Sequence, residues 1–224
     1  MFLTIAGVLD PEELQDIRKL MARASWASGA KTAGAAAREV KRNLQADLSA
    51  GSGRALKEIV MPALQANPVL TAFARPAAWS DLLLSRTEVD GGYGTHIDNP
   101  FMTKEAGRVR TDLSFTLFLS DPETYEGGEL VVELAGVTHQ VKAEAGDVLV
   151  YPSTTLHHVA TVTSGTRYAC VGWIQSMIRR ADQREIMFDL SNLKAELGQT
   201  HGRNSPEIIS ISKTIANLTR MWAE

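Results

Sequence analysis

The spacing of apolar residues changes twice along the chain. Before about residue 76 apolar positions recur at intervals of three and four residues, which is typical of amphipathic helices. From residue 77 they alternate with polar positions, as in half-buried strands, and after Met177 the helical interval returns. The pattern predicts an N-terminal helical region over residues 1–76 that packs on the core, a β domain over 77–177 and a C-terminal helical extension over 178–224.

The N-terminal region contains one clear helix start and one ambiguous helix. Asp10 is suited to cap a helix, Pro11 to occupy its first turn, and Glu13 to complete a capping box. A second apolar stripe contains Pro62, which lacks a backbone N–H, so a kink or a break is expected there and the boundary stays open. The alanine- and glycine-rich stretch over residues 29–37 predicts a loop.

Seven apolar runs in the central region predict short strands. Clusters of Gly, Asp, Pro and Ser separate them, as is typical of turns, and no helical pattern lies between them. Such a series favours antiparallel sheets in a sandwich or a jelly roll over a parallel βαβ sheet. The predicted strands are Leu82–Val89, Leu113–Leu119, Glu129–Leu134, Thr138–Ala143, Val148–Tyr151, Leu156–Val162 and Arg167–Ile174.

The end of the chain predicts a helical hairpin. Ile186 begins one apolar stripe at helical spacing and Ile208 begins the next, with Ser205 and Pro206 at the start of the second helix. We expect the hairpin to brace the sheet. The alternative is an interface with a second copy, which would give a homo-oligomer.

Composition narrows the classes of function. The 224 residues are 44% hydrophobic and 22% charged, as in ordinary globular domains, and the net charge of -3 argues against nucleic acid or anionic lipid as a partner. No stretch approaches the ~18 apolar residues of a membrane span, and the N-terminus lacks the basic start of a signal peptide. Cys170 is alone and is expected to be a buried free thiol. We therefore expect a soluble cytoplasmic protein.

Three polar side chains have the chemistry of a metal site. His96 and Asp98 are two apart, so in an extended segment they project to the same side, although an aspartate that merely accepts a bond from histidine is the alternative. His157 follows about sixty residues later, after a Pro-Ser turn. Strand parity lets only one of His157 and His158 face the same cavity, and we choose His157. Two imidazoles and a carboxylate leave three coordination positions of an octahedral ion open, which suits non-haem Fe(II). A structural zinc ion, in contrast, usually has all four of its coordination positions filled by protein side chains.

Arg167 distinguishes a bare metal site from one that also binds an acid. If residues 163–165 form a three-residue hairpin loop with Gly165 left-handed, residue 161 pairs with Arg167, and Arg167 then faces the same side as His157. A guanidinium binds a carboxylate in bidentate fashion, so Arg167 is predicted to hold the far end of a diacid chelated at the metal. The alternative is a solvated surface arginine.

The chain resembles Fe(II)- and 2-oxoglutarate-dependent dioxygenases of the prolyl/lysyl-hydroxylase type, specifically bacterial PKHD-type hydroxylases. The resemblance implies a double-stranded β-helix (jelly-roll) core, Fe²⁺ bound by His96, Asp98 and His157, 2-oxoglutarate anchored by Arg167, and L-ascorbate as the reductant of the iron. It extends along nearly the whole chain. The segments that carry it are Tyr93–Asp98, Arg110–Ser114, Leu117–Pro122, Tyr125–Leu130, Gly146–His157 and Ile174–Arg179.

The chain departs from some relatives in one respect. Those relatives present a tyrosine hydroxyl to the cosubstrate from the strand after the His-x-Asp segment, where this chain has Ser114, Thr116 and Phe118. Phenylalanine has no donor, so Thr116, Ser114 and Tyr93 are the candidates for a second cosubstrate contact, with simple packing as the alternative for each.

The resemblance implies hydroxylation of an unactivated C–H bond, with succinate and CO₂ as coproducts. The primary substrate is open: a prolyl, lysyl or other peptide side chain, or a small metabolite. Lys104, Arg108 and Arg110 are candidates for a basic lip that recruits an acidic or peptide substrate, although charged loops are more often simply solvated. The alternatives are a cupin-like protein that binds a metal or small ligand without oxidising it, and a zinc hydrolase.

Overall fold

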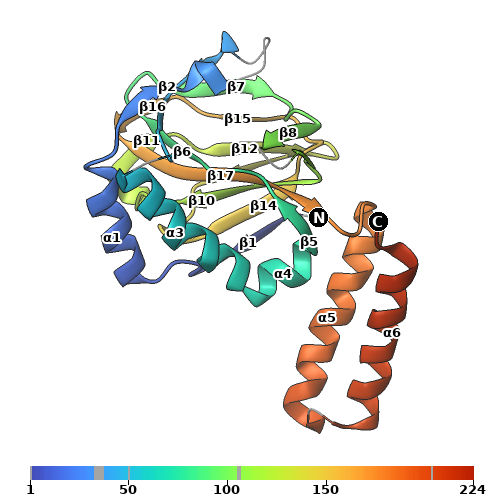
Figure 1. Ribbon diagram of the computed structural model, residues 1–224. Helices are drawn as coiled ribbons and strands as arrows, with labels where there is room; N and C mark the ends of the chain where they lie inside the picture. Colours follow the sequence, from blue (N-terminus) through green and yellow to red (C-terminus); the bar gives the residue numbers. More distant parts are fainter. Residues whose placement is uncertain (1, 33–37, 50, 105–106, 203) are drawn as a thin grey trace.

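Two antiparallel sheets face each other and form a jelly roll, as predicted. The computed structural model describes residues 2–32, 38–49, 51–104, 107–202 and 204–224. In Figure 1 the two sheets lie one above the other, with helices below and a helical hairpin at one end. Within the described ranges, no helix is long and apolar enough to cross a membrane. Residues 33–37 of the predicted loop lie outside these ranges, and residues Gly29–Thr32 form a 3-10 turn, η1.

The larger sheet carries most of the core and one wall of the cavity. Its strands are, in order, β1 (Leu3–Ile5), β14 (Val148–Pro152), β10 (Leu113–Phe118), β17 (Arg167–Ser176), β6 (Leu83–Thr87), β4 (Leu44–Ala46) and β2 (Trp26–Ser28), with β5 (Pro76–Trp79) also paired to β17. β10 and β17 lie in the middle, and their side chains are buried or half-buried throughout because both faces of the sheet are covered there.

The smaller sheet supplies the opposite wall. It consists of β13 (Val137–Val141), β12 (Leu130–Leu134), β15 (His157–Val159), β7 (Gly92–His96) and β3 (Lys41–Arg42). Two further two-stranded sheets complete the β structure: β8 (Phe101–Lys104) with β9 (Gly107–Arg110), and β11 (Tyr125–Gly127) with β16 (Val162–Gly165). The short 3-10 turn η2 (Pro122–Thr124) precedes β11.

Some strand boundaries differ from the prediction. The run Leu156–Val162 is two strands, β15 and β16, which belong to different sheets. The first 76 residues also contribute β1, β2, β3 and β4, which the helical pattern did not predict. These strands are only two or three residues long, so they show no alternation, and pairing with longer neighbours forms them.

Helices cover the outer face of the larger sheet (Figure 1). They are α1 (Pro11–Met21), α3 (Gly51–Ala66) and α4 (Pro68–Ala74), and their buried side chains join the sheet in one apolar core. The predicted capping box of α1 is present. α3 continues through Pro62 without a break, because Pro62 and Glu58, whose carbonyl loses its partner, are both exposed to water.

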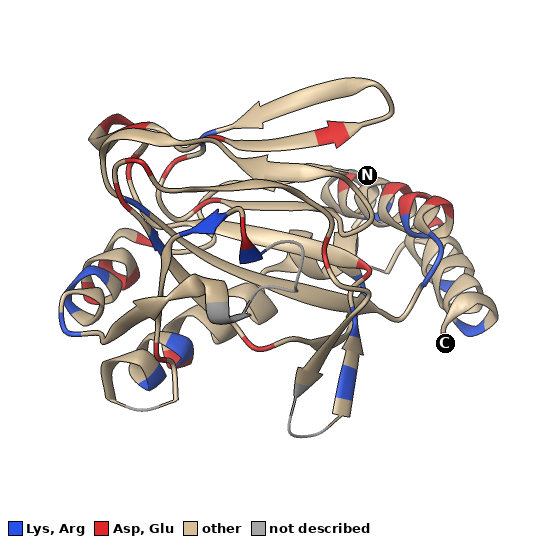
Figure 2. Ribbon diagram, turned by 90° about the horizontal axis from the view of Figure 1, so that it is seen from above, with Lys and Arg blue, Asp and Glu red and all other residues tan. Residues whose placement is uncertain are grey.

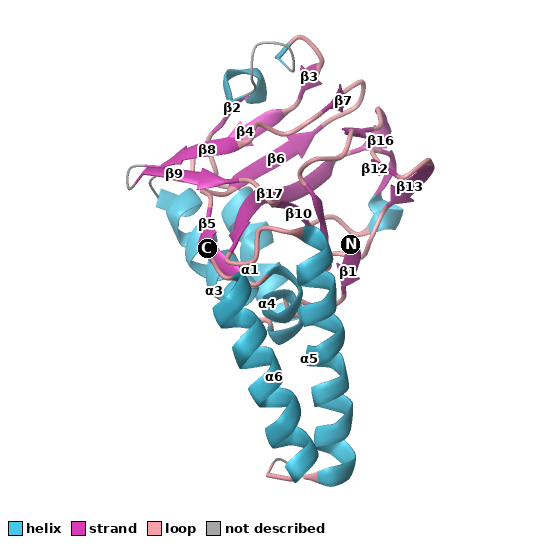
Figure 3. Ribbon diagram, turned by 90° about the vertical axis from the view of Figure 1, so that its right-hand side faces the viewer, coloured by secondary structure: helices cyan, strands magenta, loops and turns pink. Residues whose placement is uncertain are grey.

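The C-terminal hairpin touches the rest of the protein mainly at its base. α5 (Ala181–His201) and α6 (Pro206–Trp222) run away from the sheets, as Figures 1 and 3 show. Phe188 packs edge-on against Phe73 of α4 with 5.2 Å between ring centroids, and Arg75 donates hydrogen bonds to the Met187 carbonyl and the Ser191 hydroxyl. The hairpin therefore braces α4 and leaves apolar residues such as Ile209 exposed. A homo-oligomer through these helices stays a prediction.

We predict that Asp10→Ala lowers the free energy of unfolding by about 1 kcal/mol, because the backbone N–H of Glu13 loses its acceptor at 2.8 Å. Urea unfolding measures the change. Asp16→Ala is the matched control on the same helix: its exposed pair with Lys19 is expected to contribute less than about 0.5 kcal/mol. Equal losses in both variants would contradict the capping role.

Candidate active site

A cavity between the two sheets collects most of the predicted site residues. His96, Asp98, His157, Arg167, Thr116, Ser114 and Tyr93 all line it. His158 is not among the lining residues, so the choice of His157 on strand parity agrees with the structure. Phe118 does not line the cavity either, and its ring instead lies 5.6 Å from the Arg167 guanidinium carbon.

Strand register brings the metal-binding side chains together. β15 pairs with β7 so that His157 lies opposite His96, and Asp98 follows two residues after the end of β7. One ligand atom from each of the three side chains lies within 4.8 Å of the others, and this is the single such group among the described residues. Nε2 of His157 is 3.7 Å from Oδ2 of Asp98, and both side chains are less than a tenth exposed. The group can therefore contact one ion.

Backbone carbonyls fix the tautomer of both histidines. Nδ1 of His96 donates to the carbonyl of Gly94 at 2.8 Å, and Nδ1 of His157 donates to the carbonyl of Thr155 at 3.1 Å. Because a carbonyl only accepts, the proton of each neutral ring is on Nδ1, and the lone pair of Nε2 is left for a metal.

Two serines orient the aspartate. The hydroxyl of Ser114 donates to Oδ2 of Asp98 at 2.5 Å, and the hydroxyls of Ser114 and Ser153 are 2.7 Å apart. A serine has one proton, so Ser153 is the donor to Ser114. This changes the prediction for Ser114: its only proton is used by Asp98, and it has none to donate to a cosubstrate.

Burial keeps the imidazole of His96 neutral. Desolvation, together with the charge of His157, lowers the pKa of His96 from 6.5 to about 4. Tyr93 stacks on the same ring with 3.7 Å between centroids, and burial with the charge of Asp98 raises the pKa of Tyr93 to about 12. The site therefore presents a neutral imidazole and a protonated phenol at neutral pH.

Arg167 faces the cavity, but the hairpin from which we predicted this is wrong. β16 pairs with β11, Arg167 pairs with Thr87 of β6, and the chain passes from one sheet to another at residue 166. Gly165 is left-handed, as expected, with φ +74°. Arg167 faces inward because alternate residues of the long strand β17 line the cavity, including Val171 and Trp173.

The Arg167 guanidinium is buried with unused donors. The residue is 3% exposed, and its Nε and Nη2 atoms have no hydrogen-bond partner within the described protein. The Tyr125 hydroxyl lies beside the guanidinium and interacts with it, but no carboxylate in the described part of the chain forms an ion pair with Arg167. A buried charge without a counter-ion is costly, so the position is suited to a carboxylate.

Comparison with known proteins identifies the family. The family model for the 2OG-Fe(II) oxygenase superfamily matches residues 82–175, and that for the PKHD-type hydroxylase C-terminal domain matches residues 182–224. A PKHD-type hydroxylase from Hyphomonas neptunium is 47% identical over 222 residues, 99% of each chain, and one from Acaryochloris marina is 47% identical over the full length of both chains. The chain belongs to the PKHD-type hydroxylases. It is thus a 2-oxoglutarate-dependent dioxygenase that uses Fe²⁺, as its resemblance implied. Membership of this family decides against the cupin-like and zinc-hydrolase alternatives.

Solved structures share the jelly roll of this PKHD-type hydroxylase. A prolyl hydroxylase from Trichoplax adhaerens, in complex with a hypoxia inducible factor peptide fragment, has a TM-score of 0.56 at 17% identity and covers 85% of this chain and 86% of its own. HygX from Streptomyces hygroscopicus, with nickel and 2-oxoglutarate bound, has a TM-score of 0.56 at 16% identity and covers 78% and 82%. At such identities the likeness shows the fold alone.

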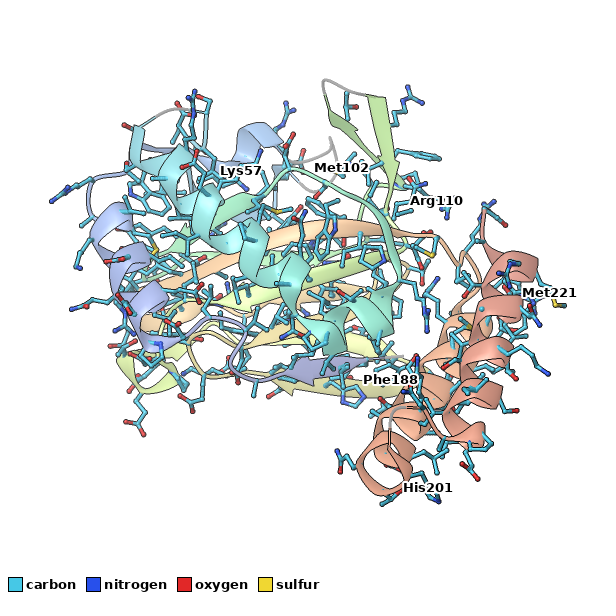
Figure 4. All side chains as sticks on the ribbon, turned by 60° about the horizontal axis from the view of Figure 1, so that its bottom comes forward. Lys57, Met102, Arg110, Phe188, His201 and Met221 are labelled. Carbon is cyan, nitrogen blue, oxygen red and sulfur yellow. The ribbon has the colours of Figure 1, made fainter. Side chains whose placement is uncertain are left out.

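One of the three residues of the basic lip predicted for this PKHD-type hydroxylase, Arg110, is bound to other groups of the protein. Arg110, labelled in Figure 4, donates to both carboxylate oxygens of Asp112 at 2.8 and 3.0 Å and to the carbonyl of Ser176. Its side chain therefore fastens β9 to the end of β17. Arg108 is exposed, and the side chain of Lys104 lies outside the described part of the chain. Figure 2 shows acidic and basic positions interspersed over the protein.

Sequence reasoning missed several residues that line the cavity. Lys41 belongs to β3, Gln45 belongs to β4, and Asn43 lies between these two strands. Tyr151 and Trp173 come from strands of the larger sheet. The alternation of polar residues at 41, 43 and 45 was the available signal, but it spans too few residues to indicate a strand without the neighbouring sheets.

We predict that Ser114→Ala lowers the affinity for a divalent metal about tenfold, because residues that hold a metal ligand in place typically contribute that much. Titration of the metal-free protein with Fe²⁺ without oxygen measures the affinity. Ser120→Ala removes a buried hydroxyl that bonds to the backbone of residues 166 and 168, away from the triad, and is the control. Unchanged affinity in Ser114→Ala would contradict the orienting role.

We predict that the metal-free protein loses stability as the pH falls from about 6.5 towards 4, because the unfolded chain takes up a proton on His96 while the folded chain does not. The slope from this group is at most about 1.4 kcal/mol per pH unit, and no contribution is expected above 6.5, where both states are neutral. Urea unfolding at several pH values measures it. His96→Gln should show a flatter profile, and identical profiles would contradict the assignment.

Proposed function

We propose that His96, Asp98 and His157 bind the catalytic Fe²⁺ and that Arg167 binds the distal carboxylate of 2-oxoglutarate in the same cavity. The observation that carries this is the common location of three metal-binding side chains and a buried guanidinium with unused donors. The donor set fits Fe²⁺, since two imidazoles and a carboxylate leave three positions open. The 2-oxoglutarate-bound HygX structure has the same fold and supports the proposal.

The protein residues have distinct proposed roles around these groups. Ser114 and Ser153 hold the Asp98 carboxylate in one orientation, while the carbonyls of residues 94 and 155 hold the two imidazoles. Thr116 and Tyr93 are the candidates for the second cosubstrate contact. Tyr125 joins them because its hydroxyl lies beside the Arg167 guanidinium.

When bound, Fe²⁺ and 2-oxoglutarate supply the activation of O₂ that oxidises a C–H bond, with succinate and CO₂ as coproducts. The protein contributes the position of the groups and a cavity that excludes water. The proposed primary substrate is a prolyl, lysyl or other peptide side chain, or a small metabolite, and ascorbate is the proposed reductant that maintains Fe²⁺.

The division into regions 1–76, 77–177 and 178–224 remains our proposal for the domain organisation.

We predict that Arg167→Gln weakens 2-oxoglutarate binding at least about thirtyfold, because loss of one partner of a buried, hydrogen-bonded charge pair costs about 2 kcal/mol or more. Calorimetric titration of the metal-loaded protein without oxygen measures the dissociation constant. Arg18→Gln, which removes an exposed pair with Asp121, is the control and should leave the constant unchanged. Unaltered affinity in Arg167→Gln would show that the cosubstrate binds elsewhere.

We predict that His96→Ala and Asp98→Ala each abolish Fe²⁺ binding and succinate formation together, since each removes one of three protein ligands. Screening peptides and small metabolites for succinate release coupled to a gain of one oxygen in mass then identifies the primary substrate. Succinate formation that persists in either variant would contradict the assignment of the triad.

A further inference from the structure

Two buried aromatic side chains contact the Arg167 guanidinium from outside the cavity. The Tyr125 hydroxyl interacts with the guanidinium, and the centroid of the Phe118 ring is 5.6 Å from its central carbon. Tyr125 is 3% exposed and Phe118 is 1% exposed. Neither is among the residues that line the cavity, whereas Arg167 is. The two aromatic residues therefore lie behind Arg167 as seen from the cavity.

The pairing of β11 with β16 brings Tyr125 to Arg167. Tyr125 lies opposite Gly165, which is two residues before Arg167, and the two strands are side by side in Figure 1. A Cβ atom at residue 165 would be 3.0 Å from the Cβ of Tyr125 and 2.3 Å from the carbonyl oxygen of Thr124. The main chains approach this closely because residue 165 is a glycine, so Tyr125 is fixed next to the start of β17.

Gly128 makes room for the two side chains to lie together. It is buried and has φ +68°, a conformation that favours glycine. A Cβ atom at this residue would be 3.0 Å from Cδ of Arg167 and 3.0 Å from Cε2 of Tyr125. The stem of the arginine and the phenol ring therefore meet at one glycine.

Lys142 restrains Tyr125 in turn. Its ammonium is 4.2 Å from the centroid of the Tyr125 ring and donates a hydrogen bond to the Tyr125 carbonyl at 2.6 Å. A cation near the face of an aromatic ring is attracted to it. Tyr125 is thus held at its main chain and its ring, while its hydroxyl reaches Arg167.

These contacts restrict the guanidinium before any ligand binds. A free arginine side chain has many rotamers, and a ligand that must immobilise it loses part of its binding free energy. Bidentate binding of a carboxylate also requires one orientation of the guanidinium plane. Removal of the Tyr125 hydroxyl or the Phe118 ring should therefore weaken binding of a carboxylate that neither residue touches.

We propose that Tyr125 and Phe118 are positioning residues for the cosubstrate and that they act only through the Arg167 guanidinium. The inference rests on the proposed function, in which Arg167 binds the distal carboxylate of 2-oxoglutarate. Among the candidates for a second cosubstrate contact, Thr116 and Tyr93 line the cavity and Tyr125 does not. Tyr125 is therefore assigned to the arginine and not to the cosubstrate.

Tyr125→Phe tests the proposal because it removes only the hydroxyl. Protein loaded with redox-inactive Ni²⁺ is titrated with 2-oxoglutarate by calorimetry. We expect about tenfold weaker binding than in the wild type, since a hydrogen bond to a charged group typically contributes that much. Tyr168→Phe is the matched control and should bind like the wild type. Tyr168 follows Arg167 in β17, and its ring packs against Trp26 on the opposite face of the sheet.

A double-mutant cycle with Arg167→Gln separates action through the arginine from direct contact with the cosubstrate. If Tyr125 acts only through the guanidinium, adding Tyr125→Phe to Arg167→Gln should cause no further loss of affinity. Phe118→Leu keeps an apolar side chain without the ring. It should weaken 2-oxoglutarate binding about fivefold alone and cause no further loss in the Arg167→Gln protein. The affinity for Ni²⁺ should be unchanged in every variant, because the triad is intact.

Three outcomes overturn the proposal. The first is that Tyr125→Phe or Phe118→Leu binds 2-oxoglutarate as tightly as the wild type. The second is that either change causes an equal further loss in the Arg167→Gln protein, which would indicate direct contact or a general change of the cavity. The third is that Tyr125→Phe weakens Ni²⁺ binding tenfold or more, which would indicate a structural role. Failure of the proposed function is recognised separately, because Arg167→Gln alone would then leave the affinity for 2-oxoglutarate unaltered.

Discussion

The register between β15 and β7 is the constraint on which the active site depends. It places His157 opposite His96 and brings both imidazoles next to Asp98. A shift of one residue would turn His157 to the outer side of the sheet and replace it with a neighbour. Both strands are short, and their own pairing contributes little stability, so the surrounding strands β12 and β3 and the apolar core hold the register. The fold thus fixes the position of the triad before any ion binds.

Polar groups around the triad restrict each side chain further. Two carbonyls select the tautomer of the histidines, and the Ser114–Ser153 pair orients the carboxylate. Arg167 lines the same cavity and has donors that the protein does not satisfy, whereas most buried polar groups in proteins are paired. This contrast separates residues that complete the protein structure from residues arranged for a ligand, and it is the physical basis for assigning a carboxylate to Arg167.

The sequence predicted the chemistry of the site better than the path of the chain. The parity of residues 157 and 158 depends only on strand periodicity, and it agrees with the structure. Asp98 reaches the cavity although it lies beyond the end of β7, where strand periodicity no longer applies. Arg167 was placed correctly from a hairpin that does not exist, because a local turn rule cannot tell which sheet a strand joins. β7 was missed since Gly92 and Gly94 interrupt its apolar pattern, and Lys41 was missed since β3 exists only through pairing with β7. Long segments such as β17 and α6 were predictable because their own sequence carries an uninterrupted apolar pattern.

A crystal structure of the protein with Mn²⁺ and 2-oxoglutarate, grown without oxygen, tests the central claim most directly. The account predicts one metal ion bound by Nε2 of His96, a carboxylate oxygen of Asp98 and Nε2 of His157, with the far carboxylate of 2-oxoglutarate on the Arg167 guanidinium. A metal ion bound elsewhere, or a 2-oxoglutarate that leaves Arg167 without a carboxylate, would contradict it.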